Sequence, residues 1–166
     1  MTEAPNQLSH ADLVLRADKW LHGQGCKVTF KELCTYTRNG EQPDNIGWTK
    51  GSTILIECKT SRQDFFADKY KKFRMIPEMG MGDWRFYLCP PKVIMPHHLP
   101  EGWGLIWCYE KIVKKIHGIP KSYHGTGPLN GHKISESQML VSALRRLQIR
   151  GHLEEIYMGV PVKEEI

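Results

Sequence analysis

Three residues near the middle of the chain have side chains that could do chemistry together. Asp44 follows a proline at the start of a β-forming segment, and Glu57 and Lys59 lie two positions apart at the end of an apolar run. Side chains alternate between the two faces of a strand, so Glu57 and Lys59 are expected on one face and Cys58 on the other. Burying the charge of either residue alone would be costly, whereas pairing around a divalent cation would explain why both lie there.

This set of residues is suited to hydrolysis of a phosphodiester bond. Asp44 and Glu57 offer the hard oxygen ligands that Mg²⁺ prefers, and the backbone carbonyl of Cys58 offers a third. A cation held there would activate a water molecule and stabilise charge on the phosphate, while Lys59 could orient the water or stabilise the transition state. We therefore predict Mg²⁺ as the cofactor, with Mn²⁺ able to replace it. A structural ion pair at a sheet edge is the alternative interpretation of these residues.

The pattern Pro43-Asp44 followed by Glu57-Cys58-Lys59 resembles the PD-(D/E)XK signature of restriction-endonuclease-like nucleases. The run from Glu57 to Phe65, with Asp68 after it, is similar to the corresponding run of MmcB-type DNA-repair nucleases and their phage relatives. The resemblance covers roughly residues 8–110 and does not extend to the C-terminal third. It implies a restriction-endonuclease-like core, DNA as the partner and activity as a metal-dependent deoxyribonuclease.

The resemblance also implies that an acid from the first helix takes part in catalysis. The predicted first helix offers Asp12 and Asp18, and Asp12 lies closer to the position at which the family carries Glu. Asp is shorter than Glu, so the choice between Asp12 and Asp18 stays open. Glu32, which lies in the next predicted strand, is a further candidate acid.

Residues on and around the predicted second helix are candidates for contact with DNA. The formal net charge of +5 is a mild basic excess, which favours a polyanionic partner. Phosphate contacts of this kind give affinity without reading base sequence. Helix capping and a solvated basic face are the structural alternatives. The predicted nucleic-acid-binding residues are Ser61, Arg62, Lys69, Lys72 and Arg74.

The elements that must position these residues follow from hydrophobic periodicity and turn signals. Strands of alternating or continuous β-formers are predicted over residues 27–37, 52–58, 84–89 and 105–109, with a further β segment that begins near Asp44. Helices are predicted from Ser9 to about residue 22, over residues 62–74 and over residues 135–148. This order predicts an α/β fold, with a central mixed sheet flanked by helices.

The length of 166 residues corresponds to one domain. We predict a single nuclease-like domain over residues 1–166, with a core over about 8–110 and a C-terminal helical extension over about 111–166. Apolar runs are far shorter than the roughly 20 residues of a membrane-spanning helix, and the polar N-terminus does not resemble a secretory signal. The five cysteines form no Cys-x-x-Cys pair, which favours reduced thiols and a cytoplasmic location.

Two other functions are compatible with the same sequence. A catalytically inactive nucleic-acid-binding module of this fold would bind DNA in a salt-sensitive, metal-independent manner. A phage or bacterial protein-interaction accessory domain would show neither DNA binding nor metal dependence. A homodimer would suit cleavage of both strands of a duplex, but nothing in the chain requires one. The sequence does not decide between DNA and RNA or between internal and terminal cleavage.

Overall fold

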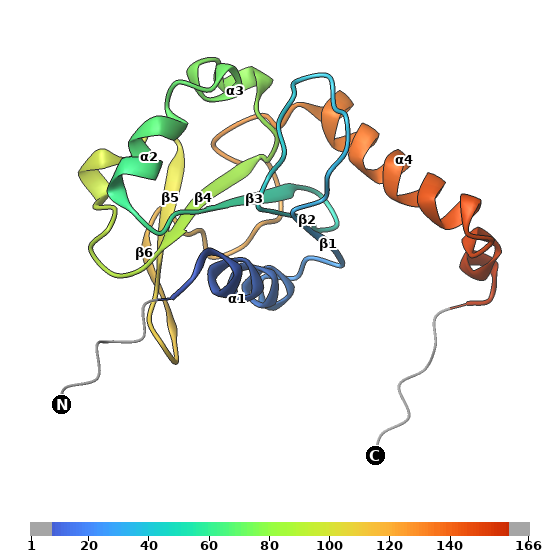
Figure 1. Cartoon of the computed structure of the whole chain (residues 1–166), viewed down its shortest axis with the longest axis horizontal. Coiled ribbons are helices and arrows are strands. Elements are labelled where there is room, and N and C mark those ends of the chain that lie inside the picture. Colours follow the sequence, from blue (N-terminus) through green and yellow to red (C-terminus); the bar gives the residue numbers. More distant parts are fainter. Residues whose placement is uncertain (1–7, 160–166) are drawn as a thin grey trace.

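The computed structural model describes residues 8–159, which form a six-stranded mixed sheet flanked by helices (Figure 1). The strands lie side by side in chain order. The neighbours β3–β4 and β4–β5 pair in parallel, and the other neighbours pair antiparallel. The predicted α/β architecture is thus confirmed. The strands are β1 (Val28–Lys31), β2 (Asn45–Trp48), β3 (Thr53–Cys58), β4 (Trp84–Cys89), β5 (Trp103–Cys108) and β6 (Val113–His117).

Helices cover both faces of this sheet. α1 lies on one face, and α2 and α3 lie on the other (Figure 1). Ser9 begins α1 because its hydroxyl accepts a hydrogen bond from the backbone N–H of Asp12, and Ser61 begins α2 in the same way with Asp64. The α-helices are α1 (His10–Gly23), α2 (Arg62–Asp68), α3 (Lys72–Met75) and α4 (Lys133–Ile149), and the 3-10 helices are Pro77–Met79, Pro96–His98 and Leu153–Tyr157.

Two hydrophobic cores follow from the alternation of side chains along β3, β4 and β5. On one face, Ile54, Ile56 and Cys58 pack with the buried side of α1. On the other face, Leu55 packs in a second cluster with Phe65 of α2. Every residue of β3 is therefore buried, as its continuous apolar sequence predicts. This strand is the rigid element that carries Glu57.

Three predicted elements differ from the structure. The strand predicted over residues 27–37 ends at Lys31, because Glu32 adopts φ = 44° and turns the chain out of the sheet. The helix predicted over residues 62–74 is divided into α2 and α3 by the turn at residues 69–71. The strand β6 was not predicted, since its sequence Val-Lys-Lys-Ile-His lacks a two-residue alternation.

The predicted border near residue 110 does not mark the end of the sheet domain. β6 pairs with β5, and the following loop places Tyr123 in the core beneath α1, where its carbonyl accepts a hydrogen bond from the Ser52 hydroxyl at 2.8 Å. The first part of α4 is anchored by the buried Ser135, Glu136 and Met139. The helix then extends away from the sheet (Figure 1). The helical spacing of apolar residues over 135–148 predicts that Leu144 and Leu147 face inward, but both are exposed, so this prediction is wrong.

All five cysteines are free, and all except Cys34 are buried. Across residues 8–159, none of the helices combines the length and the apolar character needed to cross a membrane.

Candidate active site

The ends of β2 and β3 bring the predicted residues together. The antiparallel register pairs Asn45 with Ile56, so one further step along both strands sets Asp44 opposite Glu57. The backbone N–H of Cys58 donates to Asp44 Oδ2 at 2.7 Å, which fixes the carboxylate at this edge of the sheet. The Cys58 thiol enters the core on the α1 side, as the alternation predicts.

Asp44 lies in an environment that disfavours its charge. Its side chain is 18% exposed. Burial, followed by repulsion from Glu57, raises the pKa of Asp44 to about 6, against the opposing effect of the hydrogen bond from the Cys58 N–H. A divalent cation bound here would relieve this repulsion, because it supplies positive charge directly to the carboxylate.

Two more side chains of types that can ligate a metal lie beside Asp44. His10 Nε2 is 3.4 Å from Asp44 Oδ1 and 3.2 Å from Glu32 Oε1. One ligand atom from each of the three residues falls within 4.8 Å of the others, which is compact enough for one ion. The unusual backbone of Glu32 contributes to this arrangement, since its N–H donates to the Asp44 carbonyl at 2.8 Å. Two carboxylates and an imidazole fit a divalent cation, and the nitrogen donor suits Mn²⁺ better than Mg²⁺.

Glu57 is held by cations instead of joining that group. Its Oε1 lies 2.9 Å from Arg74 Nη2, and its Oε2 lies 3.4 Å from Lys59 Nζ. The structure therefore brings both predicted carboxylates to one edge of the sheet, but groups Asp44 with His10 and Glu32. The metal set of Asp44, Glu57 and the Cys58 carbonyl stays a prediction.

Lys59 is buried and surrounded by acids. Its Nζ lies 3.5 Å from Asp68 Oδ1 and 3.9 Å from Asp64 Oδ2, in addition to its contact with Glu57. Burial alone would lower the pKa of Lys59, but Glu57, Asp68 and Asp64 outweigh it, and the pKa is raised. Lys59 is therefore positively charged at neutral pH, which suits electrostatic stabilisation and not proton abstraction.

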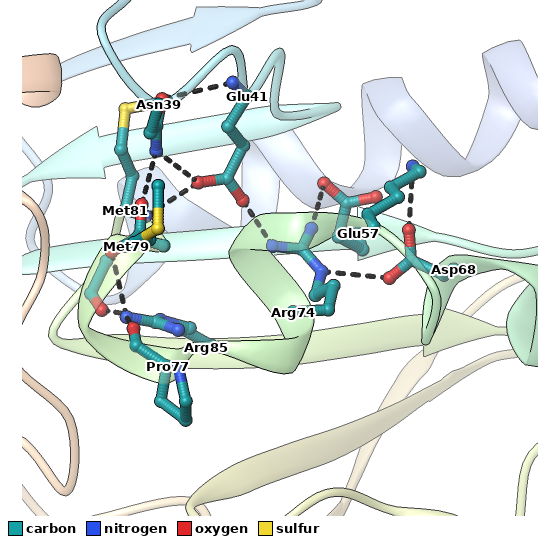
Figure 2. A network of polar contacts seen from close by, with 12 residues as sticks. Asn39, Glu41, Glu57, Asp68, Arg74, Pro77, Met79, Met81 and Arg85 are labelled. Carbon is teal, nitrogen blue, oxygen red and sulfur yellow. Dashed lines mark hydrogen bonds and ion pairs between the residues drawn. The ribbon is translucent and has the colours of Figure 1, made fainter.

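A buried network of ion pairs centres on Arg74 (Figure 2). Its guanidinium contacts Glu41, Glu57 and Asp68, with Nε 2.9 Å from Asp68 Oδ2. Burial alone would raise the pKa of Asp68, but Arg74 and Lys59 outweigh it and hold this pKa below its ordinary value. The Tyr87 hydroxyl adds a hydrogen bond to the same carboxylate at 2.8 Å. The network thus ties α2 and α3 to the end of β3.

The prediction that Arg74 contacts nucleic acid is contradicted by this position. Its side chain is 3% exposed, and its three carboxylate partners Glu41, Glu57 and Asp68 are all buried, whereas Lys59 has the exposed Asp64 among its partners. Arg74 therefore does not lie on the surface where a phosphate would bind. The sequence predicts a basic helical face because it predicts one helix over residues 62–74. The turn after Asp68 changes the direction of the chain, and α3 therefore points Arg74 inward.

The two acids proposed from the first helix are engaged elsewhere. Asp12 Oδ2 accepts hydrogen bonds from the Ser9 N–H at 2.9 Å and the Ser9 hydroxyl at 2.6 Å, and these bonds lower the pKa of Asp12. Asp18 Oδ1 accepts from the Thr29 hydroxyl at 2.7 Å. The structure brings neither into the group around Asp44. The first helix supplies His10 in their place, a residue the sequence reasoning missed although it directly follows the predicted cap, Ser9.

The other predicted nucleic-acid-binding residues lie on the surface. Ser61 caps α2, and Arg62 donates to the carbonyls of Val93 and Lys92 at 3.1 and 3.2 Å. Lys69 and Lys72 are exposed at the end of α2 and the start of α3. These four side chains remain candidates for contact with a polyanion.

Comparison with known proteins adds to the description of the fold. No family model matches the chain, and no curated protein matches it. A solved structure of a protein of unknown function from Silicibacter pomeroyi is similar, with a TM-score of 0.55 and 24% sequence identity over 95% of this chain and 99% of that chain. At this identity the likeness shows a shared fold and nothing about activity.

Proposed function

We propose that this protein is a divalent-cation-dependent nuclease that hydrolyses phosphodiester bonds in DNA. The meeting of Asp44, Glu57 and a charged Lys59 at one edge of the sheet supports this proposal. The resemblance to the PD-(D/E)XK signature rests on the same three residues. A cytoplasmic location would agree with the five free thiols.

The residues around Asp44 have separate roles in this proposal. Asp44, His10 and Glu32 would hold the cation, and Glu57 adds negative charge beside Asp44. The cation would supply Lewis acidity toward water and phosphate oxygens. Lys59, kept protonated by Glu57 and Asp68, would stabilise negative charge that develops on the phosphate.

Cleavage of a panel of DNA substrates tests the proposal. Single-stranded, duplex, nicked, flapped and branched DNA would be incubated with Mn²⁺, Mg²⁺ or EDTA. We expect metal-dependent cleavage that is faster with Mn²⁺ because of the imidazole of His10. The Lys59→Met variant should lose at least about 100-fold in rate, as removal of one electrostatic stabiliser does in other enzymes.

Asp18→Asn is a matched control for Asp44→Asn. Both carboxylates are 18% exposed, but Asp18 lies outside the group of metal-ligating side chains. We expect Asp44→Asn to abolish cleavage and Asp18→Asn to retain it. Equal cleavage by wild type and Asp44→Asn would refute the site. DNA binding without cleavage under any metal would favour the inactive binding module instead.

A further inference from the structure

An aromatic and basic surface flanks the candidate active site. Phe66, on the outer side of α2, is 38% exposed, and Tyr70, in the turn after α2, is 79% exposed. Lys69 Nζ lies 4.7 Å above the centre of the Phe66 ring, and the His98 ring lies edge-on to it at 5.7 Å. We call these four residues, Phe66, Lys69, Tyr70 and His98, the α2 platform.

Both ends of α2 adjoin the candidate active site. Ser61, which caps the helix, follows Lys59 by two residues. Asp68, at the other end, lies 3.5 Å from Lys59 Nζ and precedes Tyr70 by two residues. A seven-residue helix is roughly 10 Å long, so the platform lies within reach of a strand that is bound at the candidate active site.

The charges on this side of the molecule favour a polyanion. Within residues 8–159, Lys69 and Lys72 take part in no ion pair, whereas Lys71 lies 2.7 Å from Asp68 Oδ1. Asp64 is an exposed acid on α2. Its Oδ2 lies 3.9 Å from Lys59 Nζ, so its negative charge is partly neutralised. Positive charge is therefore available beside exposed aromatic rings.

Arg62 connects α2 to the segment that carries His98. Its guanidinium joins α2 to the carbonyls of Lys92 and Val93, at the start of the segment that carries His98. Beside the platform lies a cavity of about 280 Å³, between the end of α2 and this segment. It is lined by Lys69, Arg74, Tyr87, His98, Leu99 and Pro100.

We propose that the α2 platform binds single-stranded nucleic acid, with an unpaired base stacked on Tyr70, a neighbouring base against the exposed part of Phe66 and a phosphate beside Lys69. Base faces are free for stacking only when the strand is unpaired, because in a duplex they are covered by neighbouring base pairs. The position of the platform beside the reacting phosphate rests on the proposed nuclease function. The preference of the platform for unpaired strands does not.

Binding without metal tests this proposal separately from catalysis. Fluorescence anisotropy in EDTA would compare a labelled oligothymidylate of about 20 nucleotides with a duplex of the same length. Tyr157→Ala is the matched control for Tyr70→Ala, because Tyr157 is 78% exposed and belongs to the 3-10 helix Leu153–Tyr157. This segment follows α4, whose far end lies away from α2 (Figure 1). Both side chains are exposed, so neither substitution should disturb folding.

We expect wild type to bind the single strand more tightly than the duplex. Tyr70→Ala should weaken single-strand binding by about 5-fold to 150-fold, the loss of one stacked base, and Tyr157→Ala should not. Lys69→Met should reduce the slope of log affinity against log salt by about 0.7.

Two results would overturn the platform. These are a wild type that does not favour the single strand, and a Tyr70→Ala variant that binds as tightly as Tyr157→Ala. If metal-dependent cleavage is observed while Tyr70→Ala binds normally, the platform fails and the nuclease stands. If no cleavage is observed and Tyr70→Ala still loses binding, the platform stands and the nuclease fails.

Discussion

Replacing Asp44 with Asn should stabilise the metal-free protein above neutral pH. Burial and the charge of Glu57 raise the pKa of Asp44 from 3.8 to about 6 in the folded state. The folded protein therefore binds this proton more tightly than the unfolded chain, and the contribution of Asp44 to stability falls as the pH rises from about 4 to about 6. Asn cannot ionise, so the variant avoids this loss.

The size of the effect follows from the same pKa change. The difference between 3.8 and about 6 corresponds to about 3 kcal/mol. The amide oxygen of Asn can still accept the hydrogen bond from the Cys58 N–H, but its contact with His10 is weaker than that of a carboxylate. We therefore expect Asp44→Asn to be about 1–3 kcal/mol more stable than wild type at pH 8 and nearly equal to it at pH 4.

Urea unfolding in EDTA at both pH values measures this difference. Asp18→Asn is the control, because its carboxylate accepts from Thr29 and lies 3.3 Å from Lys31, so neutralising it gains nothing. Adding Mn²⁺ should remove most of this difference or reverse it, since an ion at about 100 times its dissociation constant stabilises wild type by about 2.7 kcal/mol. An Asp44→Asn variant that is no more stable than wild type at pH 8 would refute the electrostatic reasoning.

Two further predictions concern stability. Arg74→Met should lower the free energy of unfolding by about 3–5 kcal/mol, because it leaves buried carboxylates without their partner. This loss, measured by urea unfolding, should be smaller at pH 5 than at pH 8. Lys72 is exposed, so Lys72→Met should change the free energy of unfolding by less than about 0.5 kcal/mol. Gly104→Ala should lower the free energy of unfolding by about 1–3 kcal/mol or more, measured by thermal melting, because the new Cβ would lie 2.2 Å from Phe86 Cδ1. Gly51→Ala, which meets nothing within 4 Å, is its control, and an equal loss in both would contradict the packing argument.

Much of the sheet and the core of the candidate site could be predicted from local patterns. The continuous apolar run of β3 predicted a strand buried on both faces, and its two-residue period set Glu57 and Lys59 on one side. The caps Ser9 and Ser61 marked the starts of α1 and α2 correctly. These features depend on residues a few positions apart, and their spacing is visible in the sequence.

Tertiary structure decided which distant residues meet. His10 joins Asp44 across 34 positions only because α1 packs against the sheet with its first turn at the ends of β1 and β2. Arg74 turns from an expected surface cation into the centre of a buried network, because the chain changes direction after Asp68 and three carboxylates surround it. The sequence by itself determined the buried strand β3, the caps of α1 and α2, and the spacing of Glu57 and Lys59. Long-range packing and charge pairing determined which residues contact Asp44 and Arg74, because these energies depend on contacts between residues that lie far apart in the sequence.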